Sequence, residues 1–120
     1  MKTPATAREA LNTAISETQL QDAILDAAEK LGWLRMHTRP GRTADGWRTP
    51  LQGDKGFPDL VLARGEPKPG LLLIELKSQR GGKTTPEQRT WIKALGEAGA
   101  DVRIWRPSDW TSGLIERALA

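Results

Sequence analysis

Residues 71–77, LLLIELK, place the strongest constraint on the fold of this chain. The first half of this stretch is apolar on both faces, which is typical of a strand in the middle of a sheet covered on both sides. A shorter strand pattern at 59–63 precedes it, and the intervening residues 64–70 contain two prolines and two glycines. These residue types favour turns, so the two strands are predicted to form an antiparallel hairpin within a covered sheet.

Two capping boxes mark the starts of helices that can cover such a sheet. The SETQ motif at 16–19 precedes apolar residues at helical spacing, which predicts a helix from about 17 to 31. The TPEQ motif at 85–88 begins a second helix and places proline at the first helical position, where its missing N–H costs nothing. A last helix is predicted from Ser108, as its cap, toward Leu119.

Two further strands, at 33–38 and 101–105, complete the predicted sheet. Residues 39–57 show neither helical nor strand periodicity and are interpreted as a long loop. The order helix, strand, strand, strand, helix, strand, helix, with a right-handed crossover through the second helix, predicts an α/β fold with a mixed sheet flanked by helices. Residues 1–15 have weak helical character without a cap and are interpreted as an N-terminal leader or an extension of the first helix. Residues 16–120 then form a single domain.

Composition excludes several classes of site. The chain has no cysteine and one histidine, which rules out disulfides, thiolate metal sites and an all-histidine zinc site. A bound metal is therefore expected to be a hard ion held by carboxylates, Mg²⁺ or Mn²⁺. No apolar run is long enough to span a bilayer or to act as a secretory signal, so the expected compartment is the cytoplasm, without a membrane partner.

The net charge of +3 favours contact with a polyanion only mildly, but its distribution is uneven. Positive side chains concentrate in the loop at 39–57, which contains only two acids. This clustering is compatible with phosphate contacts and equally with a solvated polar loop. The candidate DNA contacts, one of them beyond the loop, are Arg39, Arg42, Arg48, Lys55 and Lys83. Trp47, in the same loop, is a candidate for stacking on a base.

Three charged side chains are predicted to meet at one end of the hairpin. Residues two apart in a strand point to the same face, so Glu75 and Lys77 project together, and antiparallel pairing brings Asp59 close to Glu75. Two close carboxylates repel one another, and a divalent cation removes that conflict. Lys77 then lies where an ammonium can orient a water or stabilise a phosphate. From these residues alone, an exposed Glu75–Lys77 ion pair with Asp59 as a cap is equally compatible.

The spacing of several motifs resembles the PD-(D/E)xK nuclease superfamily and, more narrowly, the VRR-NUC family. The motifs are GFPDL at 56–60, IELK at 74–77 and TPEQ at 85–88, followed by Trp91 and Leu95. The similarity runs from about residue 17 to residue 105. It implies a restriction-endonuclease-like fold and hydrolysis of DNA phosphodiester bonds with Mg²⁺ or Mn²⁺.

The resemblance also implies roles for individual residues. Asp59 and Glu75 correspond to the metal-binding acids and Lys77 to the active-site lysine. The backbone carbonyl of Leu76 corresponds to a further metal ligand. The remaining catalytic candidates are Glu17 and Gln88. Each of these two has a structural alternative, because an acid complements the dipole of a helix in its first turn and a glutamine at the third position completes a capping box.

The resulting hypothesis is a metal-dependent DNA endonuclease that cuts branched DNA, such as a junction or flap. Because one chain contains one site and a branched junction needs cuts in two strands, a C2 homodimer is expected. Two alternatives remain open. One is a non-catalytic DNA-binding subunit of a phage or bacterial recombination or packaging complex, and the other is an unrelated protein that carries the motif by coincidence.

Overall fold

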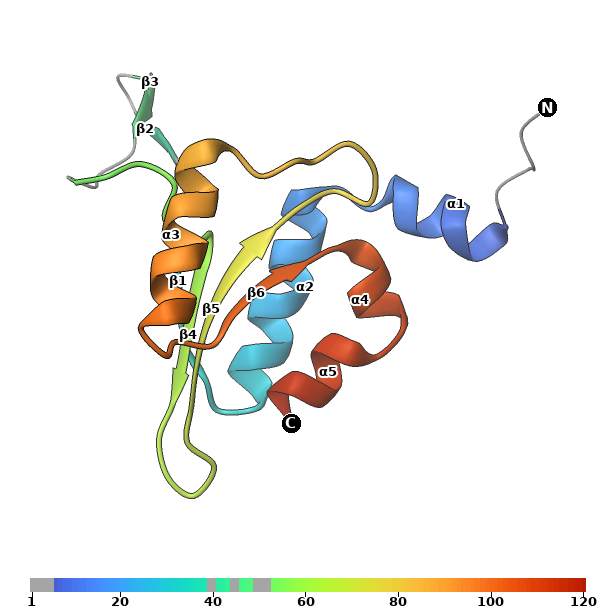
Figure 1. Ribbon diagram of the computed structural model, residues 1–120. Helices are drawn as coiled ribbons and strands as arrows, with labels where there is room; N and C mark the ends of the chain where they lie inside the picture. The colour runs from blue at the N-terminus through green and yellow to red at the C-terminus, as the bar shows by residue number, and fades with distance from the viewer. Residues whose placement is uncertain (1–5, 39–40, 44–45, 49–52) are drawn as a thin grey trace.

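The computed structural model describes residues 6–38, 41–43, 46–48 and 53–120, with the backbone alone for 41–43 and 46–48. Its centre is a four-stranded sheet in the order β1-β4-β5-β6 (Figure 1). The first three strands in this order are antiparallel, whereas β5 and β6 are parallel. The bounds of the four strands are β1 Leu34–His37, β4 Leu60–Arg64, β5 Gly70–Leu76 and β6 Val102–Trp105. The predicted mixed sheet is confirmed.

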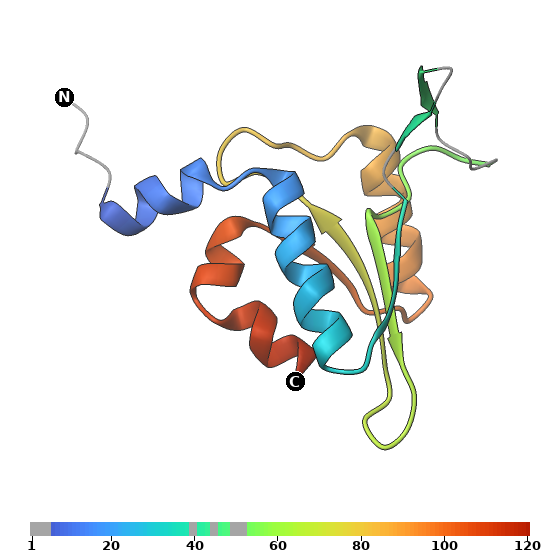
Figure 2. The ribbon, with the colours of Figure 1, turned by 180° about the vertical axis from the view of Figure 1, so that it is seen from behind.

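Helices lie on both faces of the sheet, as Figures 1 and 2 show from opposite sides. One face is covered by α3 (Pro86–Glu97). The other face is covered by α2 (Glu17–Lys30) with the short helices α4 (Pro107–Thr111) and α5 (Leu114–Leu119). None of the helices within the described ranges is long and apolar enough to cross a membrane.

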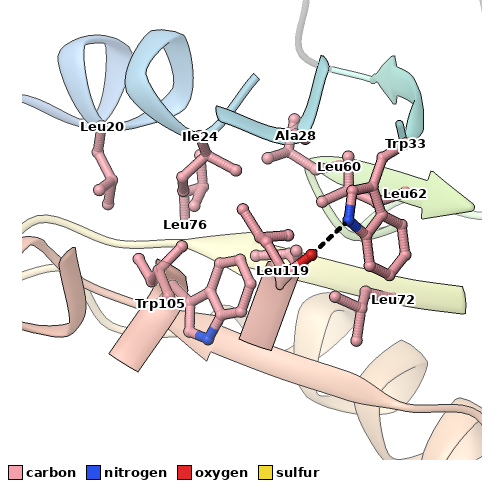
Figure 3. Close-up of a cluster of buried hydrophobic side chains, with 12 residues drawn as sticks. Leu20, Ile24, Ala28, Trp33, Leu60, Leu62, Leu72, Leu76, Trp105 and Leu119 are labelled. Carbon is pink, nitrogen blue, oxygen red and sulfur yellow. Dashed lines mark hydrogen bonds between the residues drawn. The ribbon is translucent and has the colours of Figure 1, made fainter. Parts of the chain in front are cut away.

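The hydrophobic core lies between the sheet and α2, α4 and α5 (Figure 3). Alternate residues of β5 point into it, because side chains alternate between the faces of a strand. The α2 face receives Leu72, Ile74 and Leu76, all nearly inaccessible to solvent. The opposite side of the same strand therefore carries Glu75 toward α3. Burial of the apolar face fixes the register, and the register fixes where the acid projects.

The end of the chain differs from the single helix expected from Ser108. The first helical residue is Pro107, after Arg106 as its cap, and the helix ends at Thr111. Gly113 has a φ of 84°, a left-handed conformation that interrupts a right-handed helix before α5 begins. The prediction of one continuous helix is therefore wrong.

The N-terminal segment forms a helix of its own. Helix α1 (Ala7–Ala14) begins with a capping box in which the Thr6 hydroxyl and the Glu9 carboxylate each accept a backbone N–H. The interpretation of this segment as lacking a cap is wrong. Its buried Asn12 accepts a hydrogen bond from the Thr111 hydroxyl at 2.7 Å, which joins α1 to α4.

The region expected to be an irregular loop contains a second, two-stranded sheet. Strands β2 (Gly41–Thr43) and β3 (Gly46–Arg48) pair antiparallel, with Arg42 opposite Trp47. Residues 53–59 then lead into β4 without regular structure. The expectation of a loop throughout 39–57 is therefore wrong where β2 and β3 form.

Candidate active site

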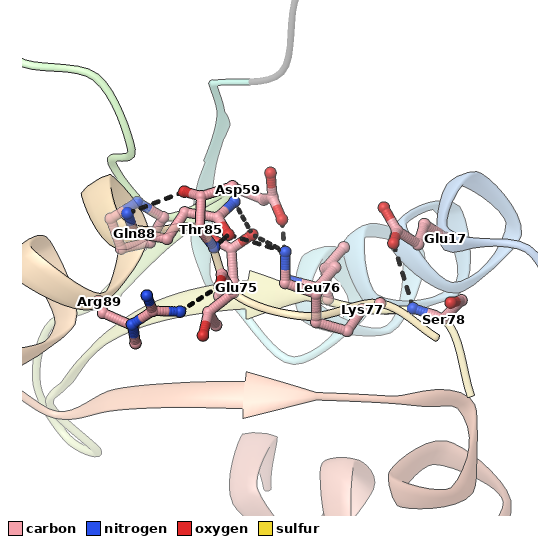
Figure 4. Close-up of polar contacts among 12 residues, drawn as sticks. Glu17, Asp59, Glu75, Leu76, Lys77, Ser78, Thr85, Gln88 and Arg89 are labelled. Atoms are coloured by element: carbon pink, nitrogen blue, oxygen red, sulfur yellow. Dashed lines mark hydrogen bonds and ion pairs between the residues drawn. The ribbon is translucent and has the colours of Figure 1, made fainter. Parts of the chain in front are cut away.

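The register of the hairpin places Asp59 beside Glu75. The ladder between β4 and β5 ends with Leu60 opposite Ile74, so Asp59, one residue earlier, lies opposite Glu75. The Oδ2 atom of Asp59 accepts the backbone N–H of Leu76 at 2.8 Å. This bond extends the contact between the strands by one residue and holds the Asp59 carboxylate at the end of β5 (Figure 4).

Glu75 is the most deeply buried charged group of this cluster, with 1% of its surface exposed. Its Oε1 atom accepts a hydrogen bond from Gln88 Nε2 at 2.9 Å and lies 3.5 Å from Lys77 Nζ. Its Oε2 atom is buried and has no hydrogen-bond partner. Because a carboxylate oxygen out of water needs a donor or a cation, Oε2 is the unsatisfied position of this site.

The pKa of Glu75 is raised to about 8, first by burial and then by the negative charge of Asp59. The positive charge of Lys77 opposes the shift without cancelling it. Without a cation, the pair therefore keeps a proton that two separate acids would release.

Gln88 joins the lysine to the acid. Its Oε1 accepts a hydrogen bond from Lys77 Nζ at 2.9 Å, while its Nε2 donates to Glu75. The same Oε1 accepts the backbone N–H of Thr85 at 2.9 Å, and the Thr85 hydroxyl accepts the Gln88 N–H at 3.1 Å. The structural and functional alternatives for Gln88 thus coexist in one side chain, because the capping box is what aims the amide at the site (Figure 4).

Glu17 lies at the same end of the sheet, in the first turn of α2. Its Oε1 atom accepts the backbone N–H of Ser78 at 3.1 Å (Figure 4). Ser78 directly follows Lys77 at the end of β5, and only 7% of the Lys77 surface is exposed. Glu17 therefore fixes the backbone next to the lysine from the α2 side.

Gly56 explains part of the motif that leads into Asp59. Its φ is 96°, and a Cβ at this position would lie 2.5 Å from the Glu87 carbonyl carbon and 2.7 Å from the Gln88 nitrogen. Only glycine allows the chain to pass this close to the first turn of α3. Gly56 begins the GFPDL motif, but the sequence alone does not reveal this packing role.

Side chains on both sides of the motif hold it in place. The Phe57 and Trp91 rings meet edge to face, with centroids 5.0 Å apart, and the Trp91 indole donates to the Asp54 carbonyl at 3.2 Å. Directly after β1, the Thr38 hydroxyl donates to the Pro58 carbonyl at 2.7 Å. Sequence analysis missed Thr38, because its contact depends on the antiparallel pairing of β1 with β4.

The predicted DNA contacts are only partly described. Lys55 and Lys83 are exposed. The backbones of Arg42, Trp47 and Arg48 lie in β2 and β3, while their side chains lie outside the described part of the structure, as does all of Arg39. The contacts of these residues with DNA remain predictions.

The donors at this site fit a hard divalent cation. Asp59 and Glu75 supply carboxylates, and the Leu76 carbonyl belongs to the residue that follows Glu75 on β5. The described ranges contain no group of three or more acidic, histidine or cysteine side chains that could hold a metal. This arrangement suits Mg²⁺, which takes one or two protein carboxylates and fills its remaining positions with water and substrate oxygens. A cation would also satisfy Glu75 Oε2.

Comparisons with known proteins identify the family and the fold of this chain. The family model described as the VRR-NUC domain matches residues 15–109. A solved structure described as a VRR_NUC domain has the same fold, with a TM-score of 0.58, 24% sequence identity and coverage of 83% of this chain and 94% of that chain. No curated protein matches the chain. The extent of the family match and the shared fold together show that this chain belongs to the VRR-NUC domain family of nucleases.

Proposed function

We propose that this protein is a Mg²⁺- or Mn²⁺-dependent DNA endonuclease that hydrolyses phosphodiester bonds in branched DNA. The observation that carries the proposal is the pair formed by Asp59 and Glu75. In this pair a buried oxygen of Glu75 lacks a partner, and the pKa of Glu75 is raised to about 8. A buried acid pair costs stability in the absence of a cation, so its presence is best explained by a bound metal.

Each residue of the site has a distinct role in this proposal. Asp59, Glu75 and the Leu76 carbonyl would hold the ion. The bound ion would supply Lewis-acid chemistry to the scissile phosphate and to a water. Lys77, held by Gln88 at 2.9 Å, presents its ammonium to the attacking water or to the charge that develops on the phosphate. Glu17 fixes the backbone that follows the lysine.

The proposal extends to the assembly of the protein and to its setting. One described site per chain and a substrate that requires two cuts support a C2 homodimer acting on DNA in the cytoplasm of a bacterium or of a phage-infected host. Sedimentation at micromolar concentration, with and without a four-way junction, tests the dimer. A monomer under both conditions contradicts it.

A non-catalytic DNA-binding subunit is the alternative. Such a protein needs positive charge for phosphates but has no use for a buried, mutually repelling acid pair beside a lysine. The geometry of Glu75 therefore favours the enzyme over the binding subunit.

A cleavage panel tests the proposal. Duplex, flap, four-way junction and single-stranded DNA are incubated in Mg²⁺ and in Mn²⁺ with the wild type, Asp59→Asn and Lys77→Met. Asparagine retains an oxygen to accept the Leu76 N–H, so Asp59→Asn removes charge while keeping the contact between the strands. We expect the wild type to cut a branched substrate and both variants to lose cleavage. Absence of cleavage of every substrate by the wild type, or an Asp59→Asn variant as fast as the wild type, contradicts the proposal.

A further inference from the structure

The segment 78–85 connects the two halves of the polar network at the site. It begins after Lys77, at the end of β5, and ends at Thr85, the cap of α3. The contact between Lys77 Nζ and Gln88 Oε1, at 2.9 Å, bridges the two ends of this segment. Any displacement of the segment therefore moves the lysine relative to the amide that orients it.

Arg106 holds this segment at two points. It directly follows β6, and its guanidinium donates from Nη1 to the Ser78 carbonyl at 2.6 Å and from Nη2 to the Gly82 carbonyl at 3.0 Å. One rigid, planar group thus closes the segment into a compact loop. The neighbouring Trp105 carbonyl accepts the Lys77 N–H at 3.1 Å, so the end of β6 contacts the backbone at the lysine and at the residue after it.

Further contacts fix the same loop next to Lys77. A Cβ on Gly82 would lie 3.2 Å from the Ser78 nitrogen and 3.3 Å from the Lys77 Cβ, so the loop folds back tightly at this point. From the far side, the Gln79 Oε1 atom accepts the backbone N–H of Ser108 at 2.8 Å. Within the loop, the Ser78 hydroxyl donates to the Arg80 carbonyl at 2.7 Å. The part that contains Gly81 and Gly82, two residues with wide backbone freedom, is held by the long-range contacts from Arg106.

We infer that Arg106 is a positioning residue for the nuclease site, acting through the 78–85 segment to fix Lys77 against Gln88 and Glu75. The inference rests on the proposed function. The hydrogen bonds of the guanidinium go to backbone carbonyls of the segment, so its effect on the reaction is exerted through the geometry of Lys77.

Steady-state cleavage of a branched substrate by Arg106→Gln tests this role. Small errors in placement of a reacting group lower the rate by roughly ten- to a hundredfold, so kcat is expected to fall by that factor, while KM changes by less than about threefold. The kcat of Arg106→Lys is expected to lie between those of the wild type and Arg106→Gln. An ammonium makes a single point of contact, whereas the guanidinium reaches two carbonyls at once.

Arg103→Gln is the matched control. Arg103 lies on β6 in an exposed pair with Asp101 at 2.9 Å, so its loss removes the same charge without touching the segment. Its kcat is expected to stay close to that of the wild type. An Arg106→Gln variant with unchanged kcat overturns the inference, and so does a rise in KM alone, which would make Arg106 a DNA contact.

A second substitution tests the segment if Arg106→Gln does not fold. Gly82→Ala leaves Arg106 in place but inserts a methyl group against Ser78 and Lys77. Gly65→Ala, in the turn between β4 and β5 with nothing within 4 Å of its Cβ, is the control. A lower kcat in Gly82→Ala alone supports the inference, and equal kcat in the two variants overturns it.

Hydrogen exchange separates this inference from the proposed function. The amides of Lys77 and Ser78 are hydrogen-bonded to Trp105 and Glu17, and they are expected to exchange faster in Arg106→Gln, while amides of β4 are unchanged. If the wild type cuts no DNA, the proposed function fails and exchange still reports the hold on the segment. Unchanged exchange at both amides overturns the inference even if the wild type is an active nuclease.

Discussion

Glu75 concentrates the electrostatic cost of the site in one side chain. Its pKa is raised from 4.5 to about 8, first by burial and then by Asp59. At pH values between these two pKa values, Glu75 keeps a proton in the folded protein and releases it in the unfolded chain. The free energy of unfolding of the metal-free protein is therefore expected to fall as the pH rises through this window. The stabilising contribution of Glu75 is fully present only below the pKa of 4.5 that it has in the unfolded chain.

Glu75→Gln isolates this contribution. Glutamine has no titrating group, so the variant is expected to lose this decline. Between pH 5 and pH 8.5 the unfolding free energy of the wild type should drop by about 4 kcal/mol more than that of the variant. Urea denaturation in the presence of a chelator at several pH values measures the difference. Parallel pH profiles for the two proteins would show that Glu75 titrates normally in the folded state.

At the scale of elements, the cap of α3 is also part of the site. Thr85→Ala removes the hydroxyl that caps α3 but leaves the Gln88 side chain, and is expected to cost about 1 kcal/mol of stability. Gln88→Ala removes the reciprocal half of the box and the links to both Lys77 and Glu75. It is expected to cost about the same stability and, in addition, most of the cleavage rate.

The comparison of these two variants is decisive because each serves as the control for the other. Denaturation curves give the stability of each, and cleavage is assayed at a temperature where both are folded. Equal losses of cleavage in Thr85→Ala and Gln88→Ala would mean that Gln88 acts only as a helix cap.

At the scale of the whole molecule, Arg64 ties the far end of the sheet to the end of the chain. Its guanidinium donates to the carbonyls of Lys68 at 2.6 Å, Leu31 at 3.2 Å and Leu119 at 2.9 Å, and it lies 4.3 Å above the ring of Trp33. These contacts join the β4–β5 turn to the ends of α2 and α5. Arg64 pairs with Gly70 at the end of the hairpin opposite Asp59.

Arg64→Met is therefore expected to lower stability without changing the site. Loss of the partly buried hydrogen bond to Leu119, of the exposed ones to Lys68 and Leu31 and of the contact with Trp33 should cost about 2–4 kcal/mol of unfolding free energy. The kcat should stay near the wild-type value well below the melting temperature. The control is Arg35→Met, which breaks an ion pair with the exposed Glu29 and should cost under about 1 kcal/mol. Similar melting temperatures for the two variants would contradict the role of Arg64.

The parts of this molecule that follow from local pattern could be predicted, and those that depend on packing could not. The alternation of β5 and its turn place Glu75, Lys77 and Asp59 together, and the TPEQ motif gives the start of α3. The reach of Arg106 to Ser78 spans 28 residues and depends on the parallel pairing of β6 with β5. No local sequence signal identifies such a contact.

Two errors in the predicted elements have local causes. The break between α4 and α5 depends on the left-handed conformation of Gly113, and a glycine within a helical pattern does not reveal its φ. The capping box of α1, Thr6 with Glu9, is visible in the sequence but stands before a short and weakly apolar run, so the pattern alone underestimated it.

A divalent cation shared by Asp59 and Glu75 is the basis of the proposed chemistry. Calorimetric titration of Mn²⁺ into the wild type and into Asp59→Asn, both shown to be folded, measures whether the two acids hold the ion together. We expect saturable binding of one ion per chain in the wild type and its loss in the variant. Binding of equal strength in the two proteins, or no binding in the wild type, would mean that the pair holds no shared ion.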